Sequence, residues 1–234
     1  MRVRGLLVVL AGALACSLSP SAARAEPPDA EVAARLAFLD ARLEAGTAAA
    51  DRWWYGWFAG FGALTLGQYG IALAIKDPGF RADMAVGAVT SSLGLLPLGA
   101  LPFTPRLAAA ELRALPEGRP GERRRKLARA EALLRKSAEA VAFRRSWLAH
   151  LAGDGVSIAS GFVLAGAYHR VRSGILNGIV GVAIVELQIF TLPRAPIADQ
   201  EAYARGAWGS AARPRGPSFG LVPAPGGLGI GAHF

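Results

Sequence analysis

The hydrophobic pattern of this chain changes character several times, and its first regular segment is amphipathic. Apolar residues recur at spacings of four, three and four between Glu26 and Asp51, with charged residues between them. A helix brings positions with this spacing onto one face, so residues 26–52 are predicted to form an amphipathic helix. The apolar face consists of Val32, Leu36, Leu39 and Leu43.

Four longer stretches are almost free of charge: Trp53–Ile75, Met84–Phe103, Trp147–Tyr168 and Gly174–Pro193. A helix of about 20 apolar residues crosses the roughly 30 Å hydrocarbon core of a bilayer, so each stretch is long enough to span it. The first stretch opens with tryptophan and tyrosine residues, which are enriched at membrane interfaces. Only a short charged loop separates the two members of each pair. We therefore expect two transmembrane helical hairpins, over residues 53–103 and 147–193.

Small residues gather on single faces of two of these predicted helices. Lipid supplies no hydrophobic drive for helices to associate, so such faces serve close packing between helix backbones. The first face consists of Gly56, Gly60, Ala63, Gly67, Gly70 and Ala74, and the second of Gly153, Ser157, Gly161 and Ala165.

The region between the hairpins, residues 104–146, is strongly basic, with twelve Lys or Arg against five Glu. Its apolar residues have helical spacing, which predicts a basic amphipathic helix. Interleaved aromatic residues and a recognisable nucleic-acid-binding module are missing, so we expect no nucleic-acid partner and favour anionic lipid headgroups. The residues predicted to contact headgroups are Arg123, Arg124, Arg125 and Lys126.

Composition supports a membrane protein. Charged residues make up 18% of the 234 residues, against about a quarter in soluble domains. Residues 194–234 are rich in Pro, Gly and Arg, which predicts a mostly irregular tail that includes a short β-hairpin near its end. The sequence therefore predicts an all-α membrane protein with two transmembrane hairpins (four spans), a basic amphipathic helix between them and a Pro/Gly-rich tail.

Residues 1–25 are typical of a secretory signal peptide: two arginines, a short apolar run and the small-residue triplet Ala23-Arg24-Ala25. Cleavage after Ala25 would remove Cys16, the single cysteine, and would leave no disulfide. We expect signal-directed export to the cytoplasmic (inner) membrane of a bacterial-type cell envelope. Export would place the basic region outside, whereas the positive-inside rule favours the cytoplasmic side. The sequence therefore does not decide on which side of the membrane the basic region lies.

Glu186 is the most informative single residue, because a carboxylate within an apolar helix needs a partner or must stay protonated. His150 and Asp154 lie one turn apart on the third predicted span, and Asn177 and Gln188 share one face of the fourth. These five residues are the candidates for polar or proton-handling roles.

No HExxH, CxxC, GxSxG or phosphate-binding glycine loop occurs in the sequence, and the three histidines are dispersed. We therefore expect no enzyme activity, metal or cofactor. The first hypothesis is a multi-pass envelope membrane protein with a scaffolding or interaction role, whose partner is a second copy or another membrane protein. The alternative is a small transporter, channel or proton-coupled component that uses Glu186 and the polar helix faces.

Overall fold

The computed structural model describes residues 27–209, 218–224 and 227–233; the predicted signal peptide lies outside these residues. The described chain is helical apart from one antiparallel pair of strands. Within these described residues, three helical stretches are long and apolar enough to cross a membrane, and they lie within Pro78–Arg113, Trp147–Gly166 and Val171–Ala204. The elements are α1 (Asp29–Ala74), α2 (Pro78–Ala100), α3 (Thr104–Arg113), α4 (Pro120–Arg144), α5 (Trp147–Gly166), α6 (Val171–Phe190), α7 (Ala195–Ala204), a 3₁₀ turn (Ala207–Gly209), β1 (Ser218–Ala224) and β2 (Gly227–His233).

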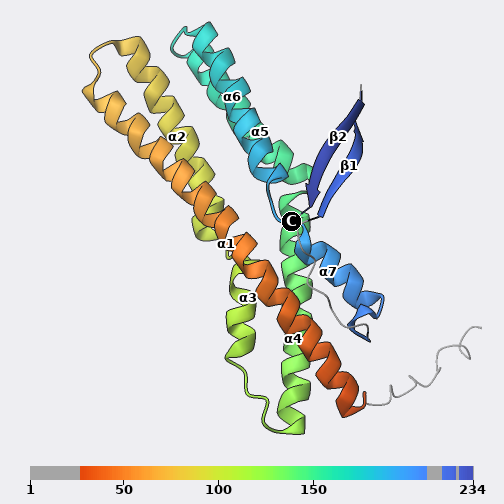
Figure 1. The fold of residues 1–234 in the computed structure, drawn as a ribbon. Helices are drawn as coiled ribbons and strands as arrows, with labels where there is room; N and C mark the ends of the chain where they lie inside the picture. Colours follow the sequence, from red (N-terminus) through yellow and green to blue (C-terminus); the bar gives the residue numbers. More distant parts are fainter. Residues whose placement is uncertain (1–26, 210–217, 225–226, 234) are drawn as a thin grey trace, which may run out of the picture.

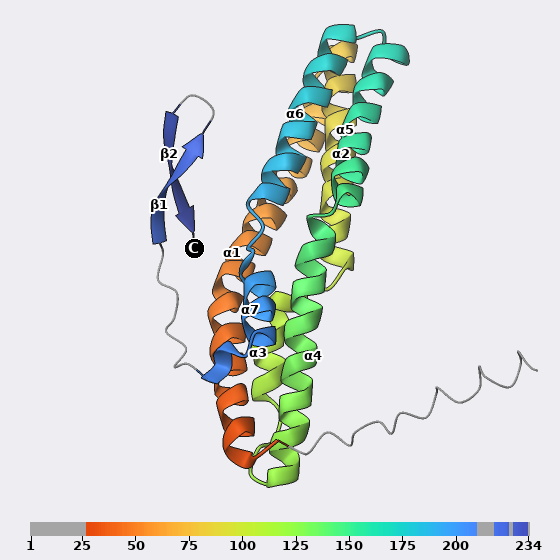
Figure 2. The ribbon, with the colours of Figure 1, turned by 90° about the vertical axis from the view of Figure 1, so that its right-hand side faces the viewer.

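The helices form two units joined end to end, and α1 runs through both (Figures 1 and 2). This helix has 46 residues, so it is about 70 Å long at 1.5 Å per residue. Its first half, residues 29–52, packs with α3, α4 and α7 into a unit that we call the headpiece. Its second half, residues 53–74, packs along α2, and these two helices with α5 and α6 form the apolar bundle.

The headpiece has an ordinary hydrophobic core. Residues that the sequence pattern put on one face of 26–52 are buried here, with Leu39 fully inaccessible to solvent. Leu112 of α3, Leu134 of α4 and Ala202 of α7 complete the core. The basic region is therefore two antiparallel helices, α3 and α4, packed on α1 rather than one helix along a surface. This arrangement follows from its apolar face, which must be covered when it is surrounded by water.

The apolar bundle differs from the headpiece because its outward-facing side chains are large and hydrophobic. Leu73 is 87% exposed, Leu66 75% and Phe162 73%. Such a surface is stable in lipid, whereas in water it would favour aggregation.

Glycines bring α5 and α6 together. A Cβ atom on Gly161 would lie 2.6 Å from the carbonyl oxygen of Gly174, and one on Gly181 would lie 2.8 Å from the side chain of Ser157. Any larger residue at these positions would push the helices apart. The face of small residues on the third predicted span is therefore a packing surface against α6.

The C-terminal region departs from the predicted irregular tail. Residues 195–204 form α7, which packs on α4 and buries Asp199 and Ala202 in the headpiece. A proline at the first turn favours a helix start. Further on, β1 and β2 pair in antiparallel register, with Leu221 opposite Ile230.

Candidate functional site

The junction between the headpiece and the apolar bundle is held by tryptophans of α1. The indole Nε1 of Trp53 donates to the carbonyl oxygen of Gln188 at 3.1 Å, and that of Trp54 to the carbonyl oxygen of Leu98 at 2.9 Å. Trp57 donates to the hydroxyl of Thr191 at 3.1 Å. These bonds tie the last turns of α2 and α6 to α1, where helix-terminal carbonyls lack helical partners.

Five arginines occupy the same level of the molecule, and we call them the junction arginines: Arg52, Arg106, Arg144, Arg145 and Arg194. Arg106 pairs with Asp51 at 2.7 Å and its guanidinium lies 3.9 Å from the ring centroid of Trp54. Among the described residues, the other four have no carboxylate within ion-pair distance. The sequence reasoning missed this group, although arginines beside Trp53 and Trp147 were the available signal.

Burial lowers the pKa of two of the junction arginines. Desolvation lowers the pKa of Arg144, whose guanidinium lies 5.2 Å from the ring centroid of Phe103. Desolvation and the nearby charge of Arg194 lower the pKa of Arg145, which donates to the carbonyl oxygen of Ile189 at 2.9 Å. This region therefore carries concentrated positive charge without an equal number of acids.

Glu186 and His150, predicted from separate helices, meet in the structure. The Nδ1 atom of His150 on α5 lies 2.6 Å from Oε1 of Glu186 on α6, a distance at which the imidazole N–H donates to the carboxylate. Asp154 interacts electrostatically with both, and its Oδ1 atom is buried without a hydrogen-bond partner among the described residues. Glu186 lies four residues before the end of α6, so the pair is close to the junction rather than at mid-depth.

Two other pairs of polar side chains in the apolar bundle form hydrogen bonds within a single hairpin. Asn177 of α6 donates to the hydroxyl of Ser160 on α5 at 2.6 Å. Ser91 of α2 donates to the side-chain oxygen of Gln68 on α1 at 2.8 Å. These two bonds lie within single hairpins, the local pairing that a low-dielectric environment favours.

A cleft of about 620 Å³ separates the two hairpins. Most of its wall is apolar, with contributions from α1, α2, α5 and α6, and Arg144 lines it from the end of α4. Asn177, Gln188 and Ser157 face it, whereas His150, Asp154 and Glu186 are outside its lining. The predicted polar candidates therefore divide into an uncharged set at the cleft and an ionisable set outside the cleft wall.

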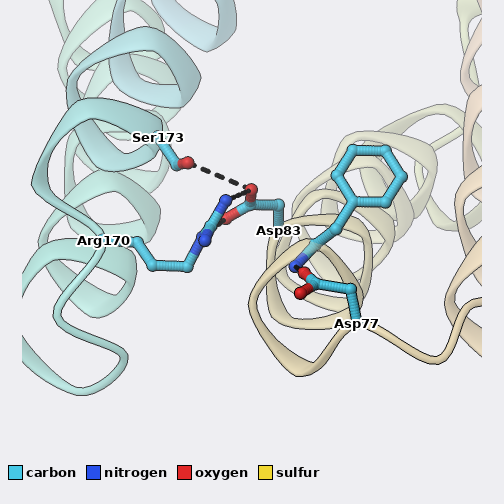
Figure 3. Close-up of polar contacts among 5 residues, drawn as sticks. Asp77, Asp83, Arg170 and Ser173 are labelled. Carbon is cyan, nitrogen blue, oxygen red and sulfur yellow. Dashed lines mark hydrogen bonds and ion pairs between the residues drawn. The ribbon is translucent and has the colours of Figure 1, made fainter.

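The opposite end of the bundle is closed by a cluster of polar contacts, shown in Figure 3. Arg170 at the α5–α6 turn makes two bonds to the carboxylate of Asp83 on α2, at 2.7 and 2.5 Å, and Ser173 donates to the same carboxylate at 3.0 Å. Asp77 caps α2 by accepting from the backbone N–H of Phe80 at 2.6 Å. We call the Arg170–Asp83–Ser173 contact the tip clasp.

The predicted headgroup residues Arg123, Arg124, Arg125 and Lys126 lie in the first turns of α4, at the end of the headpiece away from the apolar bundle (Figures 1 and 2). Arg125 precedes Arg144 by 19 positions, or about 28 Å of helix. Lys126 pairs with Glu117 at 2.7 Å, and Arg124 with Asp29 at 3.5 Å. If a bilayer surrounds the apolar bundle, distance and partial neutralisation both weigh against contact of these residues with its headgroups.

Within the described part of the chain, no group of three or more His, Cys, Asp or Glu residues is arranged to hold a metal ion. His169 lies in the α5–α6 turn, at the other end of the bundle from His150. Searches of protein-family models, curated proteins and solved structures found no match to this chain.

Proposed function

We propose that this protein is a multi-pass membrane scaffold or interaction protein without catalytic activity. It carries its helical headpiece on one side of the cytoplasmic membrane of a cell envelope, to which a cleaved signal would direct it. In this proposal the bundle crosses the membrane four times. The second half of α1 is less hydropathic than the other three spans, but it is uncharged and packs along α2, so a bilayer around α2 surrounds it as well.

The observation that carries the interaction role is the unused face of α1. Gly56, Gly60, Gly67 and Gly70 are exposed, and a Cβ on any of them would meet nothing within 4 Å in the described part of the chain. Contact with α2 uses glycines of α2 instead: Gly87 faces Gln68, and Gly94 faces Phe61. With Ala63 and Ala74 the α1 face repeats every three or four residues, a spacing that suits close approach of another transmembrane helix.

The pairing of polar groups also favours this role over conduction. A conducting path requires polar groups of several helices around one interior, whereas Glu186 bonds to His150 outside the cleft wall and Asn177 bonds to Ser160 within one hairpin. Packed helices need such local bonds for stability alone.

Leucine substitutions on α1 test whether its small-residue face mediates self-association. Replacing Gly60 and Gly67 with Leu should reduce self-association of the full chain in detergent by about tenfold or more, because the larger side chains prevent close helix approach. Analytical ultracentrifugation of the purified protein measures this change.

The matched control is Gly155→Leu on α5. Gly155 is also exposed, and none of the described residues lies within 4 Å of its Cβ position. Because it lies on a different helix, association should be unchanged. Equal association of all variants and the original chain would remove the α1 face as a self-association surface. The proposal would then depend on a different membrane partner, sought by cross-linking from position 60.

Transport is the alternative function, and the cleft is the observation that favours it. Uncharged polar side chains of Asn177 and Gln188 face this space between the hairpins. A proton flux in reconstituted vesicles that Glu186→Gln abolishes would establish the alternative, whereas a flux unaffected by this change would remove Glu186 from the mechanism.

A further inference from the structure

The cleft between the hairpins has the dimensions and lining of a ligand site. Its volume of about 620 Å³ lies within the roughly 300–1,000 Å³ typical of small-molecule pockets. Leu93 of α2, Val156 of α5 and Val180 of α6 line it and are each more than a third exposed. The exposed part of each side chain offers apolar surface that the described residues do not cover, so the wall is open to an apolar occupant.

Except for Gln188 and Arg144, the polar side chains that line the cleft already have hydrogen-bond partners. Ser91 bonds to Gln68, Asn177 bonds to Ser160, and the hydroxyl of Thr90 donates to the carbonyl oxygen of Val86 at 2.9 Å. A polar solute would find these donors engaged. A hydrocarbon chain requires none of them, so the interior suits an acyl chain better than a sugar, an amino acid or an ion.

The junction end of the cleft has the opposite character. Arg144 lines it, is partly buried, and has no carboxylate partner among the described residues. Arg145 lies next to it and is close enough to Arg194 for their charges to repel. A partly buried guanidinium without an acid is costly, and a phosphate oxygen is the anion that matches its planar donors.

The apolar interior of the cleft and the arginines at its junction end match the acyl chain and the headgroup phosphate of a phospholipid. The junction is the level of the interfacial tryptophans, where headgroups lie, and the cleft extends from there along the apolar helices. We propose that the cleft binds one anionic phospholipid, with an acyl chain between the hairpins and the headgroup phosphate on Arg144. This inference rests on the proposed membrane insertion of the bundle.

Native mass spectrometry of the full chain in detergent tests the proposal, with dioleoyl phosphatidylglycerol and dioleoyl phosphatidylcholine as probes. We expect one phosphatidylglycerol to be retained per chain, with at least tenfold preference over phosphatidylcholine. Arg144→Gln should lower phosphatidylglycerol retention by about tenfold, and Arg144→Lys should retain part of it, because the positive charge remains.

The matched control is Arg52→Gln. Arg52 is also a junction arginine, but it is exposed and outside the cleft lining, so lipid retention should not change. A second variant, Ala152→Phe, fills the cleft from α5 and should abolish retention of both lipids while Arg144 is intact. Circular dichroism and gel filtration confirm that each variant is folded.

Equal retention of the two lipids, or equal effects of Arg144→Gln and Arg52→Gln, would overturn the proposal. Alkaline carbonate extraction of cell membranes separates this failure from failure of the proposed function. A chain that resists extraction but shows no lipid preference disproves only the lipid site, whereas an extracted chain disproves membrane insertion as well.

Discussion

Tyr203 illustrates how single residues hold the headpiece together. Its hydroxyl donates to the carboxylate of Glu131 on α4, and its ring lies 6.0 Å from that of Phe38 on α1. Arg35 of α1 approaches Glu131 at 3.6 Å and lies 4.6 Å from the ring centroid of Trp208. One small network therefore joins α1, α4 and α7.

The contribution of this network to the free energy of unfolding should decrease at alkaline pH. Burial and the hydrogen bond to Glu131 raise the pKa of Tyr203 above its ordinary value of 10.0. A group whose pKa is raised on folding stabilises the native state below its unfolded pKa, and this contribution decreases as pH rises above that value. Tyr203→Phe should thus lower the free energy of unfolding by about 1 kcal/mol at pH 8, below the roughly 1.5–3 kcal/mol of a bond to a charged group because the site is partly exposed.

Thermal unfolding of the full chain in detergent measures this loss of stability. The expected decrease in Tm for Tyr203→Phe is about 2–4 °C at pH 8. It should shrink as the pH is raised above 10. Tyr168→Phe at the α5–α6 turn is the control, because Tyr168 is 49% exposed and should have little effect at either pH. A Tyr203→Phe effect that is constant from pH 8 to 11 would contradict the assigned cause.

At the scale of elements, sequence periodicity predicted the buried faces of two headpiece helices, the first half of α1 and α4. The faces containing Leu36 and Leu134 are buried in the structure, because amphipathic spacing depends only on local helix geometry. The partner of Glu186 was not predictable in this way. His150 is 36 positions away on another helix, and the register of two packed helices depends on which side chains interdigitate, which no single-helix pattern contains.

Two further features were beyond the sequence pattern for the same reason. The helix α7 has only 10 residues and lies in a region whose Pro, Gly and Arg content predicts irregular structure, so packing on α4 decides its conformation. Trp147 follows Arg144 closely in the sequence, but the role of Arg144 depends on the cleft that α2, α5 and α6 form beside it.

The tip clasp is the element-scale contact that joins the two hairpins at the end away from the headpiece. Changing Arg170 to Gln should let the hairpin tips move apart, because it removes both bonds to Asp83. Spin labels at positions 76 and 168, in a chain with Cys16 replaced by Ser, would report this as a broader and longer distance distribution. Arg172→Gln is the control, since Arg172 is exposed beside the clasp without a described ion-pair partner.

An unchanged distance distribution in Arg170→Gln would show that the helices hold the tips in place without the clasp. The remaining contacts between the hairpins would then be sufficient, chiefly the packing of α2 on α5 and the bonds of Trp53 and Trp57 to the end of α6.

At the scale of the whole molecule, the path of the chain determines which segments share a side of the membrane. The helix α1 leads from the headpiece to the tips and α2 returns, and α5 and α6 repeat this course (Figure 1). The proposed four crossings would put residues 41 and 118 of the headpiece on one side, and residues 76 and 168 of the turns on the other. Three crossings, with α1 outside the bilayer, would separate residue 41 from residue 118.

Single cysteines distinguish these arrangements in a chain with Cys16 replaced by Ser. Ala41→Cys, Gly118→Cys, Lys76→Cys and Tyr168→Cys are all at exposed positions, and a maleimide that cannot cross membranes labels only those facing the medium of intact inner-membrane vesicles. We expect positions 41 and 118 to react together and positions 76 and 168 to react together, but never all four. Signal-directed export adds that the headpiece pair reacts in spheroplasts. Opposite labelling of positions 41 and 118 would reduce the bundle to three spans, and labelling of all four in sealed vesicles would mean that the apolar helices do not cross the membrane.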